Sequence, residues 1–119
     1  MKFSKTHEWV EIDEAGKVAK IGISKKALSE LGEIVFIQLP KEGQILSDDE
    51  PMAVVESTKA AIDIYSPVQG RVCKINTDLV ENVEILNSDP QGRGWLCEVE
   101  LETPFSDEHL MSPACYAEL

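Results

Sequence analysis

The sequence predicts a mostly β fold with small helices, arranged as a β-sandwich. Several short segments alternate apolar with polar residues, which is the period of a half-buried strand. In addition, residues 40–45 and 67–72 share the pattern Pro-x-x-Gly-x-aliphatic at an offset of 27 residues. Two copies are too few for a solenoid. They suit a sandwich of two related halves, with a hairpin between them that presents Lys59, although two unrelated turns would give the same pattern.

The composition is that of one folded domain over residues 1–119, with its core at 6–101 and helical turns at 102–119. The chain is 43% hydrophobic and has 22 acidic against 11 basic residues, a net charge of −11. Such a surface repels phosphate backbones and anionic lipid, so we expect neither nucleic-acid nor membrane partners. Because residues 1–8 carry charges instead of an apolar stretch, we expect a bacterial cytoplasmic protein, or a mitochondrial matrix protein if processed.

The N-terminal part of the chain predicts a β-hairpin. Residues 7–12 and 17–23 both alternate in character, and a turn at 13–16 separates them. Ser24 is a plausible N-cap for a short helix that runs through Leu31 and ends at Gly32.

The strands that follow are marked by β-branched residues and by proline or glycine at their ends. Residues 33–39 form one such run, which Pro40 stops, and residues 48–51 mark a loop. Further strands are expected at 71–75 and 95–101. Pro104 and Pro113 stand near the expected starts of short C-terminal helices.

The segment from Val54 to Ile62 predicts an exposed hairpin tip with Lys59 at or beside it. β-branched residues flank the polar segment Ser57-Thr58-Lys59 on both sides. Ala60 and Ala61 are small and leave room for another protein. A rigid, exposed amine of this kind can be presented to an enzyme.

Catalytic and metal-binding patterns are weak in this sequence. His7-Glu8-Trp9-Val10-Glu11 lacks the second histidine of a zinc-protease helix, and no Cys-x-x-Cys occurs. Cys73 and Cys97 alternate with apolar residues and are interpreted as small core residues. With no credible acid–base, metal or nucleophile site, the chain is expected to be a carrier and not an enzyme.

The order of motifs resembles the H protein family of the glycine cleavage system, whose members are small lipoyl carriers. The resemblance covers residues 6–101 and rests on a set of short motifs: His7-Glu8-Trp9-Val10, Leu31-Gly32-Glu33-Ile34-Val35-Phe36, Val54-Val55-Glu56-Ser57-Thr58-Lys59-Ala60, Tyr65-Ser66-Pro67-Val68-Gln69-Gly70, Asn87-Ser88-Asp89-Pro90 and Gly94-Trp95-Leu96. It implies the lipoyl-domain type of flattened β-barrel or sandwich (a barrel-sandwich hybrid), with lipoate covalently attached to Lys59.

The resemblance also implies a function and partners. The chain would carry the aminomethyl group of glycine from a pyridoxal-phosphate glycine decarboxylase to a folate-dependent aminomethyltransferase. A dihydrolipoamide dehydrogenase would reoxidise the dithiol, and lipoate-attachment enzymes would load Lys59. Glu8 and Asp63 match positions expected in a cleft that holds the loaded arm, where a carboxylate would bind the amine as an ammonium; Glu30 is a weaker third candidate.

One residue and two short segments depart from the family pattern. Thr58 stands where valine is common, the loop 47–50 lacks the usual glycine, and residues 82–84 replace an Asn-Pro-Gly-type turn. They keep open an alternative function, that of an H-like lipoyl protein in lipoate relay or a redox-linked regulatory system. A plain interaction module also stays open. Biotin carriage is disfavoured because Lys59 lacks flanking methionines.

Overall fold

The computed structural model describes residues 1–47, 50–102 and 110–118. The elements, in chain order, are β1 (Lys2–Phe3), β2 (Glu8–Ile12), β3 (Val18–Ile23), α1 (Lys25–Leu31), β4 (Ile34–Gln38), β5 (Ile45–Leu46), β6 (Pro51–Ser57), β7 (Ala61–Tyr65), β8 (Gly70–Ile75), α2 (Asp78–Glu81), α3 (Glu84–Ser88), β9 (Cys97–Leu101) and α4 (Pro113–Ala117).

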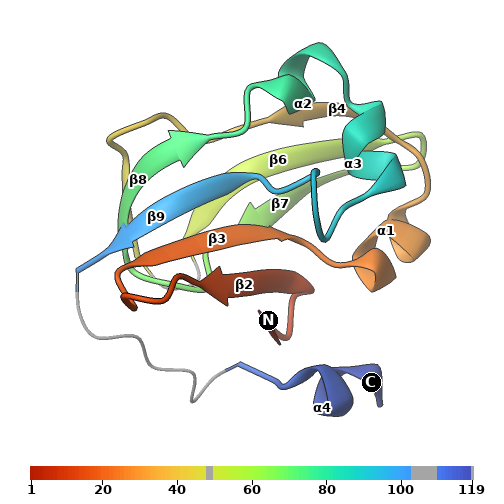
Figure 1. Ribbon diagram of the computed structural model, residues 1–119. Helices are drawn as coiled ribbons and strands as arrows, with labels where there is room; N and C mark the ends of the chain where they lie inside the picture. The colour runs from red at the N-terminus through yellow and green to blue at the C-terminus, as the bar shows by residue number, and fades with distance from the viewer. Residues whose placement is uncertain (48–49, 103–109, 119) are drawn as a thin grey trace.

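Two antiparallel sheets build the fold (Figure 1). One sheet has six strands in the order β1-β2-β3-β9-β8-β5, and the other has three in the order β4-β6-β7. A single apolar cluster takes residues from both sheets, among them Val10, Ile21, Val99, Ile37, Val55 and Ile64. This shared core confirms the mostly β sandwich expected from the alternating pattern.

The predicted N-terminal hairpin is formed by β2 and β3, with Val10 opposite Ile21. Asp13 closes its turn by accepting hydrogen bonds from the backbone N–H groups of Lys17 and Val18, at 2.9 and 3.2 Å. Both bonds stabilise the carboxylate and so lower the pKa of Asp13; the bond from Val18 has the larger effect and the bond from Lys17 the smaller. Gly16 supplies the positive φ of +71° that the turn requires.

The predicted helix is α1, with the expected caps at both ends. The Ser24 hydroxyl accepts a hydrogen bond from the backbone N–H of Ala27 at 3.1 Å. Gly32 ends the helix at φ +83°, and its N–H donates to the carbonyl of Leu28. The β4 strand begins two residues later, so α1 places Gly32 at the edge of the three-stranded sheet.

The two proline–glycine motifs lead into strands that pair with each other. Ile45 lies opposite Arg71 in the β5–β8 ladder. The N–H of Gly43 donates to the carbonyl of Val72, and the N–H of Val72 donates to the carbonyl of Gln44. In the sequence, the β6–β7 hairpin therefore lies between two segments that meet in space.

The prediction that Cys73 is a core residue is wrong, whereas the same prediction for Cys97 is confirmed. Cys97 is completely buried, and Cys73 is exposed. The inward-facing position of β8 belongs to Val72, and the register shifts between Val72 and Lys74. This shift breaks the alternation of buried and exposed residues between Ile75 and Cys73, so the Cys73 side chain does not face the core.

Two short helices, α2 and α3, were not expected from the sequence. Each is too short to show a helical period, but each buries one leucine completely, Leu79 and Leu86. The Asn87 side chain joins α3 to β4, because its oxygen accepts from the N–H of Ile34 and its amide donates to the carbonyl of Ile34.

The C-terminal helix α4 begins at Pro113, as expected from that proline, and Ser112 caps it. Pro104 lies outside the described residues. Tyr116 stacks on Phe3 with ring centroids 4.4 Å apart, in a second apolar cluster that also contains Trp9. No helix in the described ranges is long and apolar enough to cross a bilayer.

Candidate functional site

Lys59 lies in the three-residue connection between β6 and β7, as the sequence predicts. The last paired residues are Glu56 and Ala61, and the side chains from Thr58 to Ala61 are exposed. Within the same strands Val55 and Ile64 are at most 2% exposed. A hairpin anchored by buried aliphatic side chains therefore holds an exposed tip.

The hydroxyl of Ser57 organises this tip. It accepts hydrogen bonds from the backbone N–H groups of Lys59 and Ala60, both at 3.1 Å, and donates to the carbonyl of Ala60 at 3.2 Å. The N–H of Ser57 donates to the same carbonyl at 2.8 Å. One side chain thus fixes the backbone that carries the lysine, a role that the sequence analysis did not assign to it.

The segment after α1 forms a wall beside the lysine. The backbone N–H of Thr58 donates to the carbonyl of Glu33 at 3.1 Å. A methyl group built on Gly32 would lie 3.7 Å from Cε of Lys59. The stem of the lysine therefore runs past Gly32. In the described part of the chain its ammonium makes no ion pair, which leaves the amine open to chemistry.

Glu8 is one of the two predicted cleft residues, and in the structure it is buried. It is 1% exposed at the start of β2. The hydroxyls of Ser4 and Thr6 both donate to its Oε1 atom, and its own N–H donates to Ser4. Residues 4–6, which come directly before β2, thus hold the carboxylate by hydrogen bonds.

Asp63, the other predicted cleft residue, lies in the opposite sheet. It is an exposed residue of β7, paired with Val54. It borders a pocket that is also lined by Gln38, Lys41 and Pro51, at the end of β6 remote from Lys59. In the described chain the structure does not bring Asp63 together with Glu8.

Glu30, the weaker candidate, lies on α1 and faces His7. Its carboxylate is 3.8 Å from Nε2 of His7, and Nδ1 of the same ring is 2.6 Å from the hydroxyl of Tyr116. The Tyr116 hydroxyl is also 2.6 Å from that of Ser24. Burial raises the pKa of Tyr116. This network clamps α1 onto the first hairpin, and no sequence motif indicated it.

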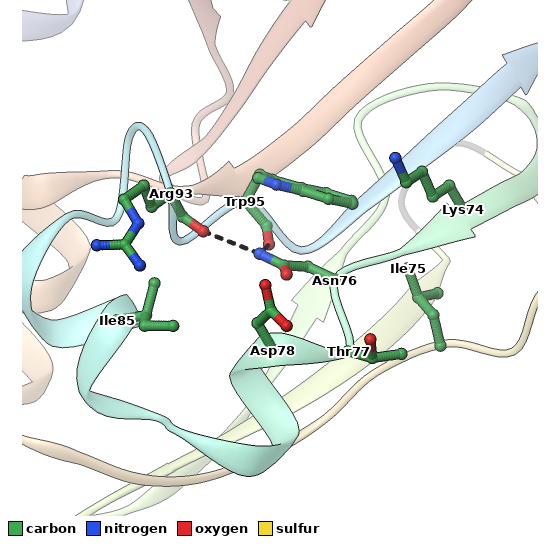
Figure 2. A pocket seen from close by; sticks show the side chains of 8 residues that line it. All are labelled: Lys74, Ile75, Asn76, Thr77, Asp78, Ile85, Arg93 and Trp95. Atoms are coloured by element: carbon green, nitrogen blue, oxygen red, sulfur yellow. Dashed lines mark hydrogen bonds between the residues drawn. The ribbon is translucent and has the colours of Figure 1, made fainter.

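A separate pocket of about 290 Å³ lies between β8, α2 and the segment before β9. Figure 2 shows Lys74, Arg93 and Trp95 at its rim, with Asn76 donating to the carbonyls of Arg93 and Trp95. Its lining includes neither Lys59 nor the predicted cleft residues. It therefore stands apart from the lysine site.

Two packed antiparallel sheets, with Lys59 on the exposed tip of a hairpin in the three-stranded one, have the arrangement of a lipoyl-type domain, a barrel-sandwich hybrid. The comparison with solved structures agrees: the crystal structure of a glycine cleavage system H protein from Mycobacterium marinum superposes with a TM-score of 0.88 and 31% sequence identity. The match covers 98% of this chain and 93% of that one.

Sequence comparisons then give the family. The family model described as Glycine cleavage H-protein matches residues 1–119. Proteins named glycine cleavage system H protein from Carboxydothermus hydrogenoformans and Xylella fastidiosa are 41% and 43% identical, each over 100% of this chain and 90% of the relative. The chain belongs to the glycine cleavage H-protein family, whose members carry covalently attached lipoate.

Proposed function

We propose that Lys59 carries lipoate in amide linkage, and that the chain shuttles the aminomethyl group of glycine from the pyridoxal-phosphate decarboxylase to the folate-dependent aminomethyltransferase. The observation that carries this proposal is the geometry of the tip. Lys59 is exposed beside the small Ala60, on a hairpin anchored by the buried side chains of Val55 and Ile64. In a member of this family, that lysine is the group positioned for attachment.

The residues around Lys59 fit such an attachment. Its amine has no ion pair among the described residues that acylation would have to break, and Gly32 leaves its stem unobstructed. When bound, lipoate supplies a strained disulfide that accepts a carbon fragment and two electrons together. The chain's own contribution is to tether that group to a rigid hairpin, which raises its effective concentration at each docked active site.

This function implies further partners and a place of action. A dihydrolipoamide dehydrogenase would return the dithiol to the disulfide, and a lipoate-attachment enzyme would modify Lys59. The carrier itself supplies no catalytic group. The bacterial cytoplasm, or the mitochondrial matrix for a processed protein, is the compartment that fits this role.

We also propose that a carboxylate binds the amine of the loaded arm as an ammonium, with Glu8 and Asp63 as two separate candidates for that carboxylate. Because Glu8 is 1% exposed under the Ser4 and Thr6 hydroxyls, its use requires that residues 4–6 move aside. Asp63 is accessible without such a change. Of the two, Glu8 has the stronger argument, since a carboxylate shielded from water attracts an ammonium more strongly than an exposed one.

The Glu8 assignment is tested by ammonia release from the loaded protein in the absence of the transferase. Glu8→Gln removes the charge and keeps the side-chain size, so we expect faster release than from the wild type. Asp63→Asn tests the second carboxylate in the same assay. Unchanged release from Glu8→Gln would show that Glu8 has no such role.

The carrier function is tested by reconstitution with purified glycine decarboxylase. Lipoylated wild-type protein should support the release of carbon dioxide from glycine, and Lys59→Arg should reduce it to background, because arginine keeps the charge but is not acylated in the same way. Lys41→Arg, at another exposed lysine, is the matched control. A lipoylated wild-type chain that the decarboxylase does not use would contradict the proposal and favour lipoate relay.

A further inference from the structure

The start of β4 turns two consecutive apolar side chains toward solvent. Ile34 pairs with Ser57 and Phe36 pairs with Glu56, so the register shifts across Val35. Val35 and Phe36 are 51% and 52% exposed, whereas Ile34 and Ile37 on either side are 1% and 4% exposed. This irregularity breaks the strand's alternation, and such bulges commonly re-aim side chains next to functional sites.

The exposed pair, named here the Val35–Phe36 patch, adjoins the lysine tip. Phe36 lies opposite Glu56, and Glu56 lies opposite Ala61 in the next strand. The carbonyl of Glu33, three residues before Phe36, accepts the hydrogen bond from the N–H of Thr58. The patch and Lys59 are therefore parts of one rigid surface and cannot separate without breaking the β4–β6 pairing.

Two acidic side chains lie beside this surface. Glu33 and Glu56 flank the patch and are both exposed. An apolar centre with a rim of one charge has the form of a protein docking site whose partner presents the opposite charge.

Other exposed apolar residues in the described chain stand apart from Lys59. Ile45 on β5 is 55% exposed and Val80 on α2 is 64% exposed, and each belongs to a different element. Scattered single residues of this kind are normal on a protein surface and need no explanation. A Phe–Val pair beside the functional lysine is different, since aromatic residues are enriched at the energetic centres of interfaces.

The length of the lysine side chain decides which partner must cover the patch. An enzyme that acylates Lys59 has to bring its active site to an amine one side-chain length from the backbone. It must therefore enclose the tip and contact the neighbouring strand. An enzyme that acts on the far end of an attached arm has no such need.

We propose that the Val35–Phe36 patch is the docking site for the enzyme that acylates Lys59. This inference rests on the carrier function proposed above. The partner's face has an apolar socket for the Phe36 ring, rimmed by lysine and arginine side chains that meet Glu33 and Glu56. The patch sets how tightly the unmodified protein binds, and Lys59 provides the reacting amine.

The test measures the modification of apo-protein by the lipoate–protein ligase of the source cells, with lipoate and ATP, as a function of apo-protein concentration. Phe36→Ser should raise the apparent KM about tenfold or more and leave kcat within about twofold, as expected when a central contact is removed. Ile45→Ser is the matched control, equal in exposure and remote from Lys59, and should behave as wild type. Phe36→Leu, which stays apolar, should recover most of the loss, and thermal unfolding checks that every variant is folded.

The possible outcomes distinguish a failure of the docking site from a failure of the proposed carrier function. A wild-type chain that the ligase does not modify at Lys59 would overturn both. A modified wild type with Phe36→Ser at the same KM would overturn the docking site alone. So would a Phe36→Ser variant that is modified normally but is used poorly by the decarboxylase, because the patch would then serve a different partner.

Discussion

Ser57 and Gly32 do more for the lysine tip than their small side chains suggest. The Ser57 hydroxyl contacts the backbone of both residues that follow Thr58, and Gly32 provides the open wall along the lysine stem. Neither is a charged residue, so nothing in the sequence marks them as parts of a site. Their roles depend on the backbone geometry of two segments that meet only in the folded chain.

Ser57→Ala should loosen the tip. Loss of the hydroxyl leaves the N–H groups of Lys59 and Ala60 without their acceptor, at a cost of about 1 kcal/mol. We expect hydrogen exchange at the Lys59 amide to become about fivefold faster, which is that energy expressed as an equilibrium constant. Ser29→Ala, at an exposed serine on α1 that bonds only locally, is the control. Equal protection of Lys59 in the wild type and in Ser57→Ala would contradict this role.

Gly32→Ala should impair both stability and modification of Lys59. Its φ of +83° lies in a region that side chains avoid, so we expect a loss of about 1–3 kcal/mol. The new methyl group would also make an ordinary van der Waals contact with Cε of Lys59, at 3.7 Å, and so reduce the rotational freedom that the glycine leaves to the stem. Gly16→Ala is the control, because Gly16 also has positive φ, at +71°, but has nothing near its added methyl group. Chemical denaturation and the rate of lipoylation measure the two effects; equal lipoylation rates in both variants would disprove the second.

Among the elements, α4 acts as a clamp on the first hairpin and on α1. Tyr116 stacks on Phe3 from β1, and its hydroxyl reaches both His7 and the Ser24 cap of α1. Since α1 ends at Gly32, the clamp also fixes the wall beside Lys59. The C-terminal helix thereby supports a site that lies far from it in the sequence.

Tyr116→Phe separates the hydroxyl from the ring. It keeps the stack on Phe3 and removes both hydrogen bonds, so we expect a loss of about 1–3 kcal/mol in the free energy of unfolding. Tyr116→Ala removes the ring as well and should cost about 3–5 kcal/mol. Urea denaturation gives both values. Equal losses in the two variants would show that the stack contributes nothing beyond the hydroxyl.

Elements with a strong local signal were predictable from the sequence, and those held by distant contacts were not. The helix from Ser24 to Gly32 has a cap at each end, and the lysine hairpin has β-branched flanks. By contrast, α3 is one short segment whose position depends on the Asn87 side chain bonding to Ile34. A contact between two separate segments produces no repeating pattern in the sequence.

The same distinction applies to the candidate site. The position of Lys59 on an exposed hairpin tip was predictable because its segment has a hairpin's composition. The burial of Glu8 was not, because residues 4–7 form a turn, with His7 at a positive φ of +71°, and the Ser4 and Thr6 hydroxyls bond to the carboxylate. The exposure of Phe36 follows from a register shift that alternation alone would not predict.

At the scale of the whole molecule, the three cysteines report on global unfolding. Burial raises the pKa of Cys97 from 9.0 to about 12, so its reactive thiolate is almost absent in the folded protein. Cys73 and Cys115 are exposed. At pH 8 we expect an alkylating reagent to label those two thiols in the native protein and Cys97 only in denaturant, as counted by intact mass. Labelling of all three thiols at equal rates in the native state would contradict the burial of Cys97 in the core.

The buried thiol also has a consequence for stability at high pH. The unfolded chain releases the Cys97 proton near its ordinary value of 9.0, whereas the folded chain holds it until about 12. The stability that this group contributes is therefore complete below pH 9 and is lost as the pH rises toward 12. Cys97→Ala should flatten that part of the stability curve, measured by urea denaturation at each pH. A curve equally steep in the variant would show that other groups cause the loss.

The most direct test of the central claim is the intact mass of the protein purified from its own cells, beside Lys59→Arg prepared in the same way. We expect a wild-type mass higher by one lipoyl group and an unmodified variant. An unmodified wild type, in cells whose other lipoyl proteins are modified, would contradict it, and the exposed lysine would then be only a surface residue on a carrier-shaped fold.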